Sequence, residues 1–157
     1  MRKFIITFFV ILSFTFSASA HVVLIGDVYY DIDYPSRSAE VSYRVHEYYS
    51  GYITVPGKVN HNGNTYKVTE IGGHAFSSCK DLISVIILEG PTYIGSGAFN
   101  NCKGLKTVTL PGSISDIKDG AFYGCYNLER IYVPRGQKNR FAAMAALREF
   151  SNIIIEK

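Results

Sequence analysis

The stretch IGGHAFSSCKDL at residues 71–82 recurs, with changes, as IGSGAFNNCKGL at residues 94–105 and as IKDGAFYGCYNL at residues 117–128. Successive copies are offset by 23 residues without a gap. Five positions agree in all three copies: an Ile, an adjacent Ala and Phe, a Cys and a Leu. This regularity indicates one structural unit that is used three times, with its apolar positions in the same places.

Each copy continues into a segment of the form LxxLxL, at residues 82–87, 105–110 and 128–133. Alternating apolar residues predict a half-buried strand, and the Ala-Phe spacing on the other side of the coil allows one turn of helix. A period of roughly 20–29 residues is typical of leucine-rich repeats. The sequence therefore predicts an α/β leucine-rich-repeat solenoid, with a short parallel β-ladder built from 23-residue coils.

The recurring Phe and Cys residues are predicted to belong to the core of this ladder. Repetition at rung spacing is what core filling requires, so we expect the three Phe rings to stack. The Cys residues are interpreted as a buried row of small apolar side chains. Rungs lie about 5 Å apart, so a disulfide between two of the three Cys stays an alternative. The two rows are Phe76, Phe99 and Phe122, and Cys79, Cys102 and Cys125.

The N-terminus has the pattern of a secretory signal peptide. Arg2 and Lys3 precede an apolar run at residues 4–16, and small residues at 18–20 offer a cleavage site before His21. We therefore expect a secreted or cell-surface protein, with the periplasm as the other location, and no membrane insertion after signal removal. Removal of the two basic residues leaves 14 Lys plus Arg (16 − 2) against 13 Asp plus Glu. This balance gives no support to nucleic-acid binding.

The remaining 137 residues (157 − 20) are divided by pattern into three parts. An Asn-Gly turn within residues 59–68 predicts one hairpin, and alternation over residues 28–33 and 40–45 predicts another. A strand at residues 51–55, followed by Pro56, matches part of a repeat. We expect a β-hairpin N-terminal cap with this partial repeat at residues 21–69, and three leucine-rich repeats at residues 70–134.

Residues 135–157 are predicted to form a helical C-terminal cap. Residues 137–150 are rich in helix formers and predict one amphipathic helix. Residues 151–156 then predict a final strand. The apolar stripe of the helix is expected to close the last rung, and binding to a membrane or to a partner helix is the alternative.

The residues that alternate with the core positions predict the candidate binding surface. They fall into two exposed columns on the strands, and Tyr and Arg are frequent hot spots of protein interfaces. The alternative is an ordinary solvated strand face, because strands favour Tyr, Thr and Ile for other reasons. The columns are Tyr52, Ser84, Thr107 and Arg130, and Thr54, Ile86, Thr109 and Tyr132.

No residue pattern predicts catalysis, a metal or a cofactor. The four His residues are scattered over the first half of the chain, and no Gly-x-Ser-x-Gly elbow is present. The Cys residues lack CxxC spacing and a matching His, so they do not predict a metal site. Asp116 and Asp119 are expected to be solvated loop residues. We therefore expect a protein that is not an enzyme and that has no cofactor.

The repeat IGxxAFxxCxxLxxVxLP, preceded by YxGxIxVPxxVxxNGxxYxVTxI, resembles the BspA-type leucine-rich repeat proteins of Bacteroides-like bacteria. This resemblance covers residues 49–134 and implies surface adhesion and recognition of another protein, such as a host extracellular-matrix or envelope protein. We expect such a partner to bind on the exposed strand face. The alternative function is a structural or assembly component of the cell envelope without a dedicated ligand.

Overall fold

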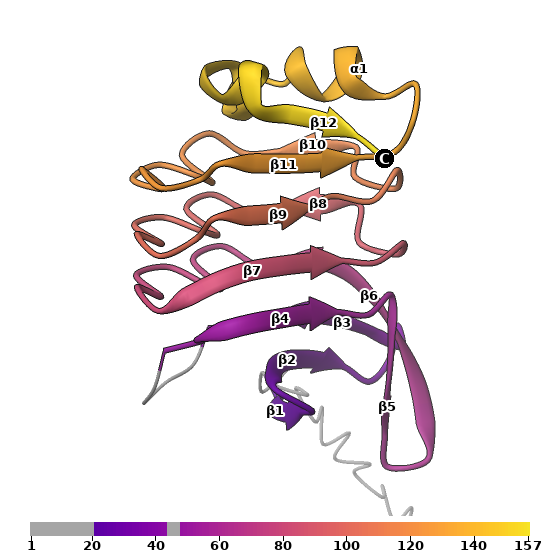
Figure 1. The fold of residues 1–157 in the computed structure, drawn as a ribbon. Coiled ribbons are helices and arrows are strands. Elements are labelled where there is room, and N and C mark those ends of the chain that lie inside the picture. The colour runs from indigo at the N-terminus through magenta and orange to yellow at the C-terminus, as the bar shows by residue number, and fades with distance from the viewer. Residues whose placement is uncertain (1–20, 44–47) are drawn as a thin grey trace, which may run out of the picture.

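The computed structural model describes residues 21–43 and 48–157. Its strands lie in two sheets, on opposite sides of each coil of the chain (Figure 1). The predicted signal peptide and the end of the strand predicted at residues 40–45 lie outside the described residues. The leucine-rich-repeat type of fold, with parallel strands and few helices, is confirmed.

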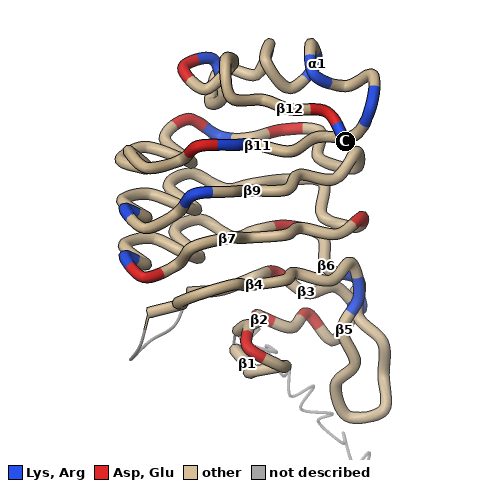
Figure 2. The backbone as a smooth tube through the Cα atoms, in the orientation of Figure 1, with Lys and Arg blue, Asp and Glu red and all other residues tan. Residues whose placement is uncertain are grey.

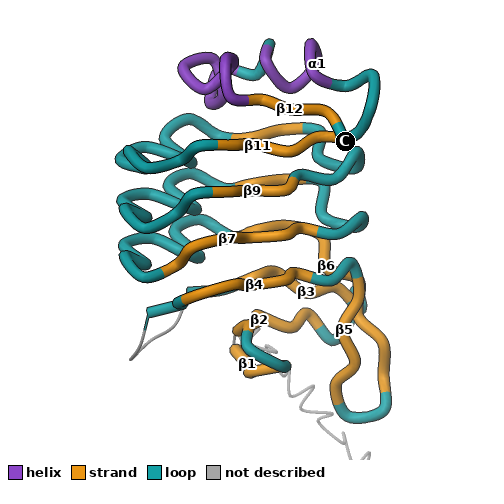
Figure 3. Tube along the Cα trace, in the orientation of Figure 1, coloured by secondary structure: helices purple, strands orange, loops and turns teal. Residues whose placement is uncertain are grey.

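The five-stranded sheet is parallel throughout and contains the repeated strands. Each strand alternates side chains between the core and solvent, and each one is separated from the next by one coil of chain (Figure 3). In spatial order the strands are β4 (Gly51–Val55), β7 (Leu82–Ile87), β9 (Thr107–Thr109), β11 (Arg130–Val133) and β12 (Ile154–Glu156).

The seven-stranded sheet combines antiparallel hairpins with short parallel strands. The hairpins predicted around residue 36 and around Asn62 and Gly63 are both confirmed, whereas the hairpin that β1 forms with β2 was not predicted. The strands are β1 (His21–Ile25), β2 (Val28–Asp33), β3 (Ser38–Val41), β5 (Lys58–His61), β6 (Asn64–Ile71), β8 (Tyr93–Ile94) and β10 (Asp116–Ile117).

The core between the sheets contains the predicted aromatic stack. Ring centroids of Phe76 and Phe99 lie 5.1 Å apart, and those of Phe99 and Phe122 lie 5.0 Å apart, with the rings nearly parallel. The stack is longer than expected, because Tyr49 contacts Phe76 at 4.7 Å and Phe150 contacts Phe122 at 6.1 Å. Aromatic side chains from outside the repeats thus close both ends of the stack.

The prediction of a helical turn at each Ala-Phe pair is wrong. These segments are tight turns, in which the Cys79 amide donates to the Phe76 carbonyl at 3.2 Å. The Phe76 amide donates instead to the carbonyl of Ala98 in the next coil, at 2.7 Å. Because stacking satisfies these backbone groups between coils, no helix is needed to satisfy them within one coil.

The prediction of one C-terminal helix is also wrong. A short helix, α1 (Lys138–Ala142), is followed by a 3₁₀ helix, η1 (Ala145–Ile153), and Met144 between them has an extended backbone. Phe141 and Leu147 are both fully buried. Residues six apart on one continuous helix point about 120° away from each other, so the break allows both side chains to face the core.

Candidate protein-binding face

The eight predicted residues lie in two rows across the five-stranded sheet, and we call this surface the strand face. Tyr52, Thr54, Ile86 and Arg130 are exposed, whereas the other four side chains are half-buried. Strand pairing places the members of each row directly beside one another. The first row is Tyr52, Ser84, Thr107 and Arg130, and the second is Thr54, Ile86, Thr109 and Tyr132.

The alternation of each strand positions these side chains. On β4, Ile53 and Val55 are buried, so Tyr52 and Thr54 point away from the core. The same pattern on β11 buries Ile131 and Val133 on either side of Tyr132. β7, β9 and β11 are each held between two neighbouring strands, whereas β4 is the edge strand and pairs with β7. Most of each row is therefore preorganised, and little conformational entropy is lost when a ligand binds there.

Polar contacts connect neighbouring strands across the strand face. The hydroxyl groups of Ser84 and Thr107 are hydrogen-bonded at 2.8 Å. The Lys157 ammonium donates to the Thr109 hydroxyl at 3.1 Å and lies 4.2 Å from the centroid of the Tyr132 ring. The Tyr132 ring is therefore held in place by a cation–π contact from the C-terminal residue.

Sequence reasoning missed two members of this surface, Ile155 and Lys157. Ile155 pairs with Tyr132 in the register of β11 and β12, and its side chain is 40% exposed. The repeat offset could have identified it, because 155 − 132 is again 23. The strand at residues 151–156 was predicted but was not aligned with the repeats, so its outward residue was overlooked.

The charges of the strand face are all positive. Arg130 and Lys157 are its charged residues, and β4, β7 and β9 contain none. Charged residues beside these strands lie in the loops that enter and leave them (Figure 2). The surface therefore presents aromatic, aliphatic and hydroxyl groups with two cations at one end.

The Cys row belongs to the core, as predicted. Cys79, Cys102 and Cys125 are buried, and no disulfide joins them. The thiol of Cys102 lies 2.9 Å from the Phe76 carbonyl, and that of Cys125 lies 3.0 Å from the Phe99 carbonyl. Its hydrogen bond with Cys125, together with burial, raises the pKa of the Cys102 thiol, and the same hydrogen bond lowers the pKa of the Cys125 thiol. A thiol held in its neutral form is a poor nucleophile.

The outer face of the seven-stranded sheet carries a row of carboxylates that the sequence did not predict. Asp31 pairs with Glu40, and Glu40 pairs with Glu70, on adjacent strands. Burial raises the pKa of Glu40 to about 7, and repulsion by the Glu70 and Asp31 carboxylates adds to this effect. The Glu40 carboxyl lies against Gly72, where a larger residue would meet it.

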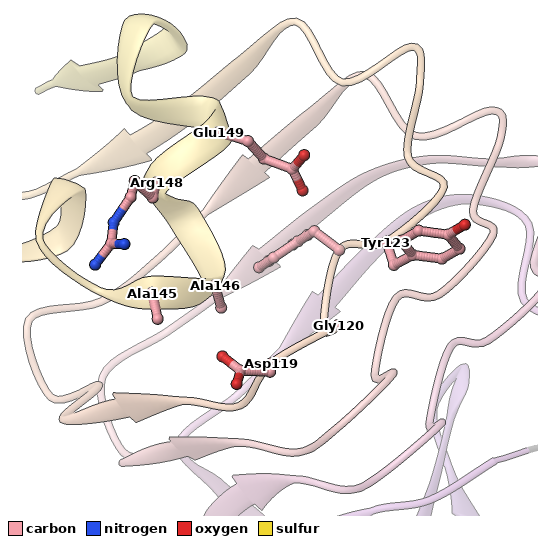
Figure 4. A pocket seen from close by; sticks show the side chains of 8 residues that line it. Asp119, Gly120, Tyr123, Ala145, Ala146, Arg148 and Glu149 are labelled. Carbon is pink, nitrogen blue, oxygen red and sulfur yellow. The ribbon is translucent and has the colours of Figure 1, made fainter.

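A shallow groove of about 400 Å³ lies between the last repeat and η1 (Figure 4). Phe122 and two Ala residues line it, with charged groups at its rim. Asp119 and Glu149 contribute carboxylates to this rim. Figure 4 shows the Arg148 side chain on the far side of η1 from Tyr123. Asp119 is exposed, as expected for a loop residue. Asp116 is also exposed, but the prediction that it lies in a loop is wrong, because it belongs to the short strand β10; its carboxylate pairs with Lys118 at 2.8 Å.

The described part of the chain contains neither a membrane-spanning helix nor a group of side chains suited to a metal ion. Over residues 21–43 and 48–157, no helix is long and apolar enough to cross a membrane. The same residues contain no cluster of three or more His, Cys, Asp or Glu side chains that could hold a metal ion.

Several crystal structures of bacterial leucine-rich repeat proteins are similar to this chain. A leucine-rich cell-surface protein from Faecalibacterium prausnitzii is 29% identical, with a TM-score of 0.59 over 73% of this chain and 33% of that chain. A leucine-rich repeat protein from Bacteroides ovatus is 26% identical, with a TM-score of 0.61 over 71% of this chain and 31% of that chain. This chain thus spans about a third of either relative's length.

A third structure, the leucine-rich repeat protein of T. pallidum, shares the fold at 20% identity, with a TM-score of 0.58 over 71% of this chain and 52% of that chain. No curated protein matches the chain. The family model described as the BspA type leucine rich repeat region (6 copies) matches residues 60–156, which is more than half of the sequence. The chain therefore belongs to the BspA-type leucine-rich repeat family.

Proposed function

We propose that this protein is a non-catalytic recognition and adhesion module that binds another protein through the strand face. The residue mix carries the proposal: Tyr52, Tyr132 and Arg130 lie in rows with an exposed Ile on a preorganised ladder. Leucine-rich repeat families typically have no enzymatic activity. A host extracellular-matrix or envelope protein is the partner that we expect.

We further propose that the described chain is a short solenoid that is closed at both ends. The hairpins of β1–β3 and β5–β6 cover the first coil, and α1 with η1 covers the last. Burial of Phe141 and Leu147 supports the C-terminal cover. At the other end, Tyr49 is buried, and its hydroxyl accepts a hydrogen bond from the Tyr29 amide at 2.9 Å and donates one to the Ser42 carbonyl at 2.8 Å.

Export by the signal peptide would bring this surface to its partner. The cell-surface location of the F. prausnitzii relative supports the proposal. We expect the mass of the protein purified from its own organism to correspond to cleavage between Ala20 and His21. A protein that keeps residues 1–20, or that fractionates with the cytoplasm, would contradict export.

The binding proposal is tested with immobilised extracellular-matrix proteins and with envelope extracts from the same organism. Replacement of both Arg130 and Tyr132 by Ala should weaken capture at least about tenfold, because Tyr and Arg residues commonly dominate interface energies. The control replaces Tyr123 and Tyr126, which are 62% and 76% exposed in a loop away from the strand face. If the R130A/Y132A variant is captured as strongly as the wild-type protein, the strand face is not the binding surface.

A further inference from the structure

Strand β1 forms an open edge of the seven-stranded sheet. It pairs with β2 on one side, and no described strand pairs with its other side. The opposite end of the molecule differs, since α1 and η1 lie over the last strand, β12 (Figure 1). An open strand edge presents unpaired amide and carbonyl groups, which form a template for another chain.

The turn between β1 and β2 determines which backbone groups face outward. Gly26 and Asp27 form a two-residue loop, with Gly26 at a φ of 61°, so Ile25 and Val28 form the hydrogen-bonded closing pair. Hydrogen-bonded and non-hydrogen-bonded pairs alternate along an antiparallel ladder. Leu24 and Val22 therefore direct their N–H and C=O groups away from β2.

The contacts of Tyr29 support this register independently. Tyr29 lies opposite Leu24. Its amide donates to the Tyr49 hydroxyl at 2.9 Å, and its carbonyl accepts from the Ser42 amide at 2.8 Å. Both Tyr29 groups thus face away from β1, which is the geometry of a non-hydrogen-bonded pair.

The side chains of β1 suit pairing as well as its backbone does. Val22 and Leu24 are 38% and 51% exposed, and the strand HVVLI contains no Asp, Glu, Lys, Arg or Pro. Natural edge strands are commonly protected by charged side chains, by Pro or by a bulge. β1 has none of these protections, and all five of its residues pair regularly with β2.

We propose that β1 pairs with β1 of a second copy of this chain, antiparallel and centred on Val23. In this register Val22 of each copy lies opposite Leu24 of the other, so the outward backbone groups form two hydrogen-bonded pairs. The edge is self-complementary, because each pair joins Val22 of one copy to Leu24 of the other and no like charges meet. A twofold axis relates two such identical surfaces.

The dimer is weak, because one short strand per copy buries a small area. We expect a dissociation constant on the order of 0.1 mM, measured by sedimentation equilibrium of the purified protein. β1 belongs to the other sheet, although Leu24 lines one pocket together with Tyr52 of the strand face. The R130A/Y132A variant, altered at the far end of the strand face, should therefore associate like the wild type. A protein that remains monomeric at about 1 mM would overturn it.

Cysteine cross-linking tests the register. Val23 faces Val23 of the second copy in a non-hydrogen-bonded pair, whose Cα atoms lie about 4.5 Å apart, within disulfide reach. V23C should therefore form a covalent dimer under mild oxidation, whereas V22C, which faces Leu24 of the second copy, should not. The native Cys residues are buried and do not compete. Equal cross-linking of the two variants would refute the register.

A backbone test separates strand pairing from side-chain contact. V22P removes an outward N–H from each copy but leaves the bonds between β1 and β2 intact, whereas V22T keeps the N–H. Loss of two intermolecular hydrogen bonds should weaken V22P association about 30-fold relative to V22T. Similar melting temperatures of the two variants would confirm the fold. Equal association of both variants would show that the copies meet elsewhere.

Discussion

The two sheets of this molecule share one core and differ in the groups that they expose. The strand face carries hydroxyl, aliphatic and aromatic groups with the cations Arg130 and Lys157. The outer face of the seven-stranded sheet carries the carboxylates of Asp31, Glu40 and Glu70 in one row. Residues that point inward repeat from coil to coil, whereas those that point outward vary. The repeat therefore determines the scaffold, and the outward positions are where recognition can be acquired.

Removal of one ring from the shared core should have the largest effect. Phe99 is fully buried between Phe76 and Phe122, so F99A leaves a cavity that should cost about 3–5 kcal/mol in the free energy of unfolding. Urea denaturation measures this loss. The control, Y123A, alters an exposed ring and should change stability by less than about 0.5 kcal/mol. A small loss for F99A would mean that the sheets do not depend on a common stack.

Substitutions in the turns that connect the two sheets should have the second-largest effect on stability. Gly97 has a φ of 63°, and a Cβ there would lie 2.6 Å from the His74 ring. Gly120 has a φ of 74° in open space. G97A should therefore cost about 2–3 kcal/mol, from backbone strain and the clash together, and G120A about 1 kcal/mol, from strain alone. Thermal unfolding separates the two variants, and equal losses would show that the His74 ring moves aside freely.

The carboxylate row should make stability depend on pH. The pKa of Glu40 is raised from 4.5 to about 7, first by burial and then by Glu70. The fold therefore favours the protonated form, so stability should fall as pH rises from 4.5 through 7. Allowing for solvent screening, we expect a loss of about 1–2 kcal/mol.

The variant E40Q should remove most of this pH dependence, which urea denaturation between pH 4.5 and 8 would measure. The control is E129Q, an exposed residue beside the strand face, which should retain the wild-type profile. A wild-type profile in E40Q would assign the pH dependence to another group.

The contact at the C-terminus should have the smallest effect. Lys157 is exposed, and its cation–π contact with Tyr132 should contribute about 0.5–1 kcal/mol. A double-mutant cycle of K157A and Y132A measures this coupling. High salt should also weaken it, because the contact is electrostatic. A coupling energy of zero would mean that the Tyr132 ring is held by the strand alone.

Much of the scaffold could be predicted because the repeat displays the core three times. The residues Phe99 and Cys102 each have equivalents at the 23-residue offset, and their burial follows from that repetition. The helix predicted at the Ala-Phe pairs was wrong because the amide of Phe76 bonds to the next coil. A single coil of sequence gives no sign of that partner.

The candidate surface was predictable in its register but not in its extent. Alignment of the strands paired Thr109 with Tyr132, as the structure has them. Lys157 was missed because a terminal residue without a repeated motif gives no periodic signal. The raised pKa of Glu40 depends on packing between hairpins that are distant in sequence, so it could be found only in three dimensions.

The aromatic rings that close the stack leave its number of coils free to change. Tyr49 ends the column at one side and Phe150 at the other, and neither belongs to a repeated copy. The coil of Phe99 meets an equivalent coil on either side. A duplicated 23-residue unit inserted after Ser115 would therefore pack between two existing coils of the same kind. Tyr49 and Phe150 would still cover the two ends of the longer stack. Growth of such a molecule by gene duplication therefore needs no change in either residue.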